Sequence, residues 1–522
     1  MKKYILFILT ISIFFGFLYA QKPSPPPRLV VGIMIDGLEQ QRLQDLWNYF
    51  PWGGFKKIAG EGSYFTNMIY NQMSAGNCAD AASVLTGSVP YYHGVTGEMF
   101  YSRSKDKTFP IITDEIQMEL RALQPVSARR LLASTVVDEL KMTYSNAKTY
   151  SIGVDAGAAI MLGGHTANAV AWLDNKFMRW NSTAYYSEGL TRYAEQMNTN
   201  GEFEKITSQV WTRYSYSYNY YRANNTFRYQ ASDKQPNSLA TILKTTPAAN
   251  ELVAKLALKI FEGEQLGTDD TPDMLMLQFT LQTPDNKRFS AEREDMYLRL
   301  DAEIAKLLSK IYEKVNKDNV LVFVFGNQTA VHTPADLGQN NVSAGYFNAG
   351  RSIALLNTYL MALYGQERWV TGYCEKNIFL NREKIEEKNL NLLEMQRTVA
   401  TFMHEFEGIQ AAFPVADLML INTDENGSFS RIINSIHKKT AGDVIITLLP
   451  GWLELNDEMN PIGTTTVMQT IVPVYFSGWK TRIREIDTPY YITDIAPTLC
   501  KILNIPRPNA CIGKVIKEVT ER

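Results

Sequence analysis

The stretch RLVVGIMID (residues 28–36) decides the fold of this chain, and Gly37 follows it directly. Six of the eight residues before the acid are Leu, Val, Ile or Met, with no polar alternation. Such a run is typical of a strand that is buried on both faces of a parallel sheet. Chemistry collects at the carboxyl ends of these strands, so Asp36 is a candidate site residue. The alternative is that Asp36 caps the following turn or helix.

Apolar runs of similar length recur along the chain and alternate with helical patterns. Helices are predicted over 291–315 and 394–409, and further strands over 149–154, 273–280, 320–325, 416–421, 443–448 and 471–476. The alternation indicates one large α/β domain over 28–522. The Tyr- and Asn-rich stretch at about 177–250 interrupts it, and we expect an inserted cap there. Its tyrosines either pack this cap or form an adaptable binding surface.

The overall composition is that of a globular protein. The chain has 522 residues, of which 45% are hydrophobic and 20% charged, and its formal net charge is −2. This mixture excludes a disordered or fibrous chain. Because no basic field is present to attract polyanions, we expect no nucleic-acid partner.

The N-terminus predicts export. Lys2 and Lys3 precede an apolar run that ends near Ala20, so residues 1–20 are predicted to be a signal peptide and 21–27 a Pro-rich leader. An uncleaved N-terminal anchor remains an alternative, and no further stretch predicts a transmembrane span. Export makes disulfides feasible among the four cysteines. Cys500 and Cys511 flank a Pro-containing turn and are the predicted pair, the alternative being four buried thiols.

Several motifs in register resemble one known family over nearly the whole mature chain. They are VVGIMIDG (30–37), LTGSVPYYHGVTG (85–97), RRLLASTVVDELK (129–141), GGHTANAVAWLDNKFMRW (163–180), EDMYLRLD (294–301), AGYFN (344–348) and IVPVYFSG (471–478). The chain resembles the alkaline phosphatase superfamily, and within it the secreted bacterial alkaline phosphatases with a Thr nucleophile. The resemblance implies a central sheet flanked by helices, with an inserted lid or cap subdomain.

The resemblance also implies a two-zinc site, which this chain matches at one position. Such enzymes hold the two metal ions with Asp and His ligands, and Asp36 occupies the first ligand position. The nucleophile position falls on Asn77, whose amide cannot form an oxyanion nucleophile. Ser74 and Cys78 lie nearby, but a shift by one residue at a helix start turns a side chain by about 100°.

The remaining family positions carry other residue types. After the strand at 273–280 the expected acid is ambiguous among Gln282, Thr283 and Asp285, and no His follows it until His332. Further ligand positions fall on Asn327, Gln328 and Ile462. The positions of the phosphate clamp fall on Glu98, Asp155 and Gly157, which replace an amide and two cations by two acids and a glycine. A cleft so lined repels phosphate.

The histidines have ordinary structural explanations. His93 and His165 match structural loops of the family, His404 lies on a helical pattern, and His437 is next to two lysines. His332 is expected in a surface loop. Asp36, left with few partners, is expected to accept backbone N–H bonds from the turn at 37–41 or to pair with a neighbour.

Two functional hypotheses follow. The first is an inactive pseudophosphatase, exported to the periplasm or cell envelope of a Gram-negative-type bacterium, with no cofactor and with a binding or assembly role toward an unknown envelope protein or small ligand. The second is an active metal-dependent phosphomonoesterase or phosphodiesterase. It would hold zinc in a rebuilt site made of Asp36, Asp285 and His332.

Overall fold

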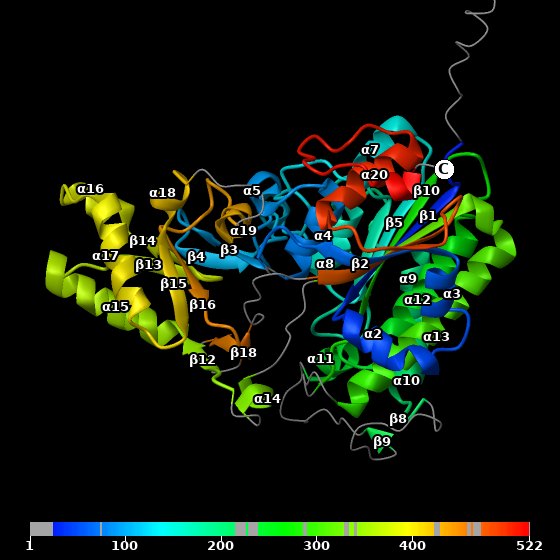
Figure 1. The fold of residues 1–522 in the computed structure, drawn as a ribbon, viewed down its shortest axis with the longest axis horizontal. Coiled ribbons are helices and arrows are strands. Elements are labelled where there is room, and N and C mark those ends of the chain that lie inside the picture. Colours follow the sequence, from blue (N-terminus) through cyan, green and yellow to red (C-terminus); the bar gives the residue numbers. More distant parts are fainter. Residues whose placement is uncertain are drawn as a thin grey trace, which may run out of the picture.

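The computed structural model describes residues 25–73, 76–214, 226–227, 238–284, 290–327, 334–338, 342–421, 428–456, 461–462 and 471–520. A ten-stranded sheet forms the centre of the larger lobe (Figure 1). Its strands, in spatial order, are β20 (Arg484–Ile486), β2 (Gly62–Ile69), β19 (Ile471–Gly478), β11 (Val320–Gly326), β1 (Leu29–Asp36), β10 (Asp273–Thr280), β5 (Thr149–Gly153), β6 (Ala169–Leu173) and β7 (Trp180–Asn181), with β21 (Tyr490–Tyr491) paired to β2.

Strand β1 lies in the middle of this sheet, parallel to both of its neighbours. Its register with β10 pairs Asp36 with Thr280, and its register with β11 pairs Ile35 with Gly326. The three strands therefore end side by side, and Asn327, directly after β11, lies at the same edge as Asp36. The sheet itself is mixed, because β19 runs antiparallel to β11 and β7 runs antiparallel to β6.

Both faces of β1 are buried, as the unbroken apolar run predicts. Val31 and Ile33 belong to one hydrophobic cluster, whereas Val30 and Met34 belong to the cluster on the opposite face. Gly32 lies where a Cβ would be 2.5 Å from Met276 Cε and 2.6 Å from Phe323 Cζ. The packing of the sheet thus leaves no room for a side chain at this position.

Helices cover both faces of the sheet. The cluster on one face contains residues of α12 (Pro247–Gly263) and α13 (Ala291–Lys314), and that on the other contains residues of α4 (Asn77–Thr86), α7 (Val136–Thr143), α8 (Ala156–Gly163) and α20 (Ile495–Leu503). Shorter helices are α2 (Gln40–Leu46), η1 (Trp47–Tyr49), α3 (Phe55–Gly60), α5 (Pro90–His93), α6 (Glu115–Glu119), α9 (Arg192–Thr199), α10 (Glu202–Thr207), α11 (Ser238–Lys244), η2 (Lys317–Asn319), η3 (Ile492–Asp494) and α21 (Lys517–Thr520). Two hairpins are β3 (Met99–Ser102) with β4 (Lys107–Pro110), and β8 (Trp211–Thr212) with β9 (Thr226–Phe227).

A smaller lobe carries its own sheets and hydrophobic core (Figure 1). A four-stranded sheet has the order β13 (Val370–Cys374), β14 (Asn377–Leu380), β16 (Val444–Leu448) and β15 (Ile409–Pro414). A three-stranded sheet joins β12 (Gly345–Asn348), β17 (Trp452–Leu455) and β18 (Pro461–Ile462). The helices of this region are α14 (Pro334–Gly338), α15 (Ala349–Tyr364), α16 (Arg382–Glu387), α17 (Leu392–His404), α18 (Val415–Leu418) and α19 (Ser428–Asn434).

The β3–β4 hairpin of the larger lobe joins the two lobes. The rings of Tyr101 and Phe379 lie 4.5 Å apart between their centroids, and Arg103 donates to Asp443 at 2.8 Å. Asp443 is fully buried and also accepts from the backbone N–H of Leu380 at 2.7 Å. A charge-assisted hydrogen bond to a buried carboxylate is stronger than a neutral one, so this contact anchors the smaller lobe.

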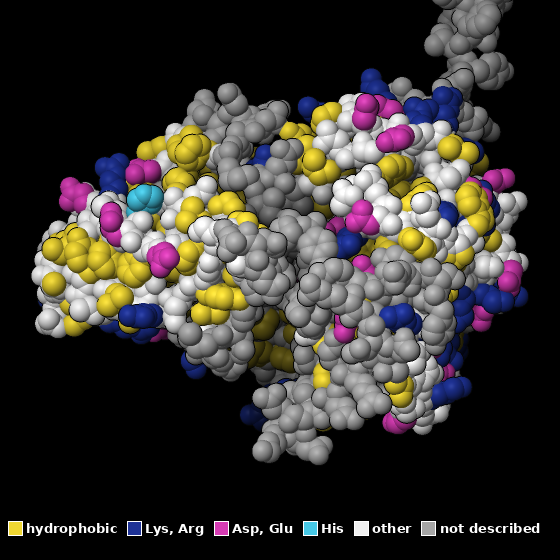
Figure 2. All heavy atoms as spheres, turned by 60° about the horizontal axis from the view of Figure 1, so that its bottom comes forward, with side chains coloured by type: hydrophobic (Ala, Val, Ile, Leu, Met, Phe, Trp, Pro, Cys, Tyr) yellow, Lys and Arg dark blue, Asp and Glu magenta, His cyan; other side chains and the backbone are white. Residues whose placement is uncertain are grey.

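On the face seen in Figure 2, hydrophobic side chains gather on the smaller lobe at the left. Both lobes also show Lys and Arg among Asp and Glu, and further hydrophobic side chains are visible on the larger lobe. Among the exposed apolar residues, Leu355 and Leu363 of α15 belong to the smaller lobe. None of the helices within the described ranges has the length and apolar character needed to cross a membrane.

Most of the predicted elements are confirmed. The runs at 149–154, 273–280, 320–325, 443–448 and 471–476 are strands, and the two predicted helices are α13 and α17. The strand predicted over 416–421 is wrong, because this segment contains the end of α18 and a turn. The predicted cap region at 177–250 contains β7, α9, α10, β8, β9 and α11, and its residues 215–225 and 228–237 lie outside the described chain.

Candidate active site

Three side chains meet where β1 and β11 end and α4 begins. The Asn327 amide donates to Asp36 Oδ1 at 2.6 Å and to Asn77 Oδ1 at 2.5 Å, and its own oxygen accepts from the backbone N–H of Gly37 at 2.9 Å. Gly37 adopts a positive φ of 87°, which glycine tolerates. Asn327 therefore links the acid of β1, the first residue of α4 and the turn after β1.

Of the two roles expected for Asp36, the structure shows the pairing with neighbouring side chains. The backbone N–H of Gly37 donates to Asn327, and side chains surround the carboxylate instead. Gln282 Nε2 lies 3.4 Å from Asp36 Oδ1, and Thr280 Oγ1 lies 3.5 Å from Oδ2. Burial raises the pKa of Asp36, and the hydrogen bonds from Asn327 and Gln282 partly offset that rise.

A buried arginine contacts Gln282, one of the partners of this carboxylate. Arg293, in the first turn of α13, is 4% exposed, and its Nη2 lies 3.5 Å from Gln282 Oε1. Its Nη1 lies 3.7 Å from Glu39 Oε1. The positive charge of Arg293 lowers the pKa of Asp36, against the larger effect of burial. Sequence reasoning missed Arg293, because a charged residue in a helical pattern looks like a solvated one.

On the other side of Asn77, Glu98, which was predicted at a position of the phosphate clamp, forms a pair with the thiol of Cys78. The Cys78 thiol lies 3.0 Å from Glu98 Oε2, and the backbone N–H of Cys78 donates to Oε1 at 2.9 Å. Burial first, and then the nearby Asp155, raise the pKa of Glu98 to about 8. Burial and the charge of Glu98 also raise the pKa of Cys78 well above its ordinary value, so its thiol stays protonated near neutral pH.

Asp155 and Gly157 lie against this pair. Asp155 caps α8 by accepting from the backbone N–H of Ala158 at 3.0 Å. A Cβ on Gly157 would be only 2.2 Å from Cys78 Sγ and 3.4 Å from Glu98 Oε2. The structure thus brings Glu98, Asp155 and Gly157 together, and it leaves no space for a side chain at Gly157.

The smaller lobe adds a further acid. Glu375, in the turn between β13 and β14, accepts from the backbone N–H groups of Glu98 at 2.8 Å and of Met99 at 2.9 Å. Burial raises the pKa of Glu375 to about 7 despite these bonds. A lysine of the larger lobe, Lys244 on α11, also lies near Asp155: burial lowers its pKa, and the negative charge of Asp155 raises it. Glu375 was not predicted, since no motif marks a hairpin turn so distant in sequence.

The structure does not test every predicted position. Ser74, Asp285, Gln328 and His332 lie outside the described residues, as do the signal peptide and residues 21–24 of the leader. Ile462 belongs to β18, where it pairs with Glu454 of β17 in the three-stranded sheet of the smaller lobe. The rebuilt site of the second hypothesis therefore remains a prediction.

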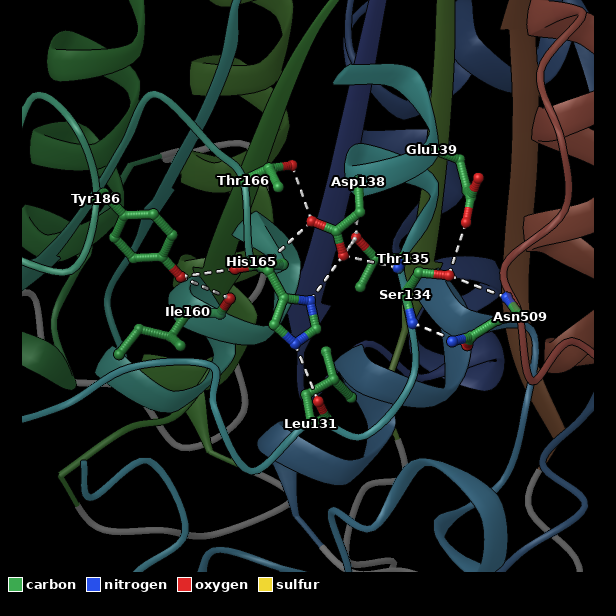
Figure 3. Close-up of polar contacts among 11 residues, drawn as sticks. Leu131, Ser134, Thr135, Asp138, Glu139, Ile160, His165, Thr166, Tyr186 and Asn509 are labelled. Atoms are coloured by element: carbon green, nitrogen blue, oxygen red, sulfur yellow. Dashed lines mark hydrogen bonds and ion pairs between the residues drawn. The ribbon is translucent and has the colours of Figure 1, made fainter. Parts of the chain in front are cut away.

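His165 links two loops of the larger lobe (Figure 3). Its Nδ1 lies 2.8 Å from Asp138 Oδ2, and its Nε2 lies 2.9 Å from the carbonyl oxygen of Leu131. Thr135 and Thr166 also donate to the Asp138 carboxylate, at 2.9 and 2.8 Å. Burial lowers the pKa of His165, but the bonds to Asp138 outweigh it, and the net result is a raised pKa.

His93 lies in a second polar cluster and is completely buried. Its Nε2 lies 3.0 Å from Ser83 Oγ, and burial lowers the pKa of His93 to about 3. His93 and His165 are thus bound within the fold, away from Asp36.

Comparison with known proteins identifies the family to which the chain belongs. The family model described as type I phosphodiesterase / nucleotide pyrophosphatase matches residues 30–476. The chain belongs to this family. The alkaline phosphatase PafA of Elizabethkingia meningoseptica is 26% identical over 100% of this chain and 99% of the relative. The alkaline phosphatase PhoV of Synechococcus elongatus is 25% identical over 94% of this chain and 93% of the relative. The crystal structure of wild-type PafA superposes with a TM-score of 0.85 at 24% identity, covering 95% of this chain and 100% of that one, and confirms the fold.

The family comparison corrects one expectation. The prediction of no cofactor is wrong, because the relatives are alkaline phosphatases, a metal-dependent class of enzyme. The described residues fit the family's metal set poorly. Within them no group of three or more His, Cys, Asp or Glu side chains could hold a metal ion, and the partners of Asp36 include amide N–H donors, which do not bind metal ions.

Proposed function

We propose that this chain is an exported member of its family that does not hydrolyse phosphate esters and that acts by binding in the cell envelope of a Gram-negative-type bacterium. Its partner would be an envelope protein or a small ligand. Function depends on the site rather than on the fold, so the catalytic names of the relatives do not transfer with the architecture.

One observation carries this proposal. The residue at the nucleophile position, Asn77, is an amide whose oxygen already accepts a hydrogen bond from Asn327. An amide cannot supply the alkoxide that attacks phosphorus in a covalent mechanism. Cys78 does not replace it, because its thiol donates to Glu98 and a raised pKa keeps it protonated.

The clamp positions support the same conclusion. A phosphoryl group gains its transition-state stabilisation from cations and N–H donors that face its oxygens. Here Glu98 and Asp155 face one another, and Glu375 of the smaller lobe lies directly behind Glu98. Above about pH 8, where Glu98 and Glu375 are ionised, each carboxylate repels a phosphate dianion; below it they are neutral and still supply no positive charge to the phosphoryl oxygens.

The test is an activity assay on the purified, untagged protein with zinc added. We expect the turnover of p-nitrophenyl phosphate and bis-p-nitrophenyl phosphate to equal that of the Asn77→Ala variant. The proposal concerns hydrolysis and is independent of metal content, which is measured separately by mass spectrometry of the same samples.

The controls separate the two hypotheses. Turnover that disappears in Asn77→Ala would overturn the proposal. Turnover that survives in Asn77→Ala but disappears in both Asp36→Asn and His332→Ala would instead support the rebuilt metal site. Export is tested by fractionation, since a protein that stays in the cytoplasm would contradict that part of the proposal.

A further inference from the structure

We propose that Cys500 and Cys511 form a dithiol pair that oxidises to a disulfide and ties the C-terminal segment to α20. The structure holds both residues as free thiols. In the cell this oxidation rests on the proposed export, because disulfides persist in oxidising compartments. The chemistry of the pair itself does not depend on location.

The chain between the two cysteines folds back on itself. Helix α20 ends at Leu503, and the next residue, Asn504, has a positive φ of 55°. The backbone N–H of Ile505 donates to the carbonyl oxygen of Cys500 at 3.0 Å. The N–H of Cys511 then donates to the carbonyl oxygen of Pro508 at 3.0 Å. The two turns reverse the chain and bring Cys511 back toward the body of the helix.

Gly87 fixes where Cys511 lies. Gly87 follows α4, and its carbonyl oxygen accepts from the N–H groups of Ile512 at 2.9 Å and of Gly513 at 3.2 Å. A Cβ on Gly87 would lie 2.7 Å from Cys511 Sγ and 3.0 Å from the Cβ of Ala496 on α20. Cys511 Sγ and the side chain of Ala496 therefore both lie next to the same point.

Cys500 is on the same face of α20 as Ala496. Residues four apart on a helix are neighbours on its surface, and Cys500 follows Ala496 by one turn. Burial first, and then the charge of Cys511, raise the pKa of Cys500. The fold thus brings the two sulfur atoms to one side of one helix.

The other two cysteines lie elsewhere. Cys78 is bonded to Glu98 at the candidate active site, and Cys374 packs with Tyr101 and Phe379 at the junction of the lobes. A disulfide between 500 and 511 is therefore the pairing that the fold favours.

Access to the two thiols differs and sets the order of the steps. Cys511 is partly exposed, whereas Cys500 is 1% exposed. With oxidised glutathione as the oxidant, the Cys511 thiolate attacks one glutathione sulfur, forms a mixed disulfide and releases one glutathione. The Cys500 thiolate then attacks Cys511 Sγ, the protein disulfide forms and the second glutathione leaves. The protein loses two protons and two electrons, and the electrons reduce the glutathione disulfide.

The experiment uses the purified full chain in a series of glutathione redox buffers, followed by acid quenching and alkylation of free thiols. Peptide mass spectrometry is expected to show a 500–511 cross-link with Cys78 and Cys374 alkylated. In Cys500→Ser, the mixed glutathione disulfide is expected to accumulate on Cys511, because the resolving thiol is gone. Reduction is expected to lower the unfolding temperature of the wild-type protein, but not that of Cys500→Ser. Cys374→Ala is the matched control, and in this variant the 500–511 cross-link is expected to form as in the wild type.

Three outcomes would overturn the proposal: both thiols alkylated throughout the redox series, a wild-type protein that stops at the mixed disulfide, or cross-linking to Cys78 or Cys374. Because the purified protein is oxidised in vitro, these outcomes do not depend on the proposed export or inactivity. A cross-link that forms in vitro but is missing from protein isolated from cells would count against export alone.

Discussion

Replacing Glu98 by Gln should remove a pH-dependent penalty that the acidic cluster imposes on folding. The pKa of Glu98 is about 8 in the folded protein, against an ordinary value of 4.5. Between these two values the unfolded chain has released a proton that the folded chain still holds, so stability falls as pH rises. The penalty is complete above pH 8 and disappears below about pH 4.5.

The size of this penalty follows from the shift. At about 1.4 kcal/mol for each pKa unit, the full difference corresponds to about 4 to 5 kcal/mol. The Glu98 side chain is only partly buried, and part of the rise in its pKa comes from the charge of Asp155. Small movements of both side chains would reduce that repulsion, so the full figure is an upper limit. We therefore expect Glu98→Gln to raise the free energy of unfolding by about 2 kcal/mol at pH 9. At pH 5 we expect it to lower the free energy of unfolding by about 1 kcal/mol, because the only effect there is the loss of one oxygen that accepts a hydrogen bond from Cys78.

Urea unfolding of both proteins from pH 5 to pH 9 measures these differences through the transition midpoint. Cys78→Ala is an informative control. It removes a hydrogen bond that lowers the pKa of Glu98, so the loss of stability should become larger and extend to higher pH. Parallel pH profiles for the wild type and Glu98→Gln would refute this account of the cluster.

Three further predictions concern the same lobe. Gly157→Ala should destabilise the protein by about 1–3 kcal/mol, because the added methyl group overpacks against Cys78 Sγ. A double-mutant cycle of urea midpoints should show that adding Cys78→Ala recovers most of this loss, whereas additive losses would contradict the contact. Arg293→Met should raise the pKa of Asp36 further, which NMR titration of the side-chain carboxyl would detect, and an unchanged titration would exclude the coupling. His165→Gln should remove about 1 kcal/mol of stability that the wild type has below pH 6.5 and loses as pH rises through the raised pKa of His165. A difference in unfolding midpoint between the wild type and His165→Gln that is the same at pH 5.5 and pH 8.5 would disprove it.

The central sheet could be predicted because its sequence signal is local. The runs that form β1, β10 and β11 are mostly apolar and show no regular polar alternation, a pattern typical of strands that are buried on both faces. The same rule failed over 416–421, where a short apolar run after Pro414 begins as the helix α18. Short apolar runs fit a buried helix as well as a strand, and only tertiary contacts decide between them.

The candidate site was predictable only where it follows a motif. Asp36, Asn77, Glu98 and Gly157 could be identified from segments in register with the family, and the structure brings the last two together. Glu375 could not be found in this way, because a hairpin turn of another lobe supplies it through a contact far apart in sequence.

The sheet edge places these residues through the backbone. The register of β1 pairs Asp36 with Thr280 of β10 and Ile35 with Gly326 of β11, so Asn327, the next residue after β11, lies at the same edge whatever the side chains are. Asn327 then uses both of its N–H groups and its oxygen, on Asp36, Asn77 and Gly37. Buried polar groups cost free energy only when they lack partners, so this arrangement stabilises the edge that the family uses for chemistry. Asn77 and Asn327 thus satisfy one another's polar groups at this edge, so the scaffold keeps its hydrogen bonds with an amide at position 77.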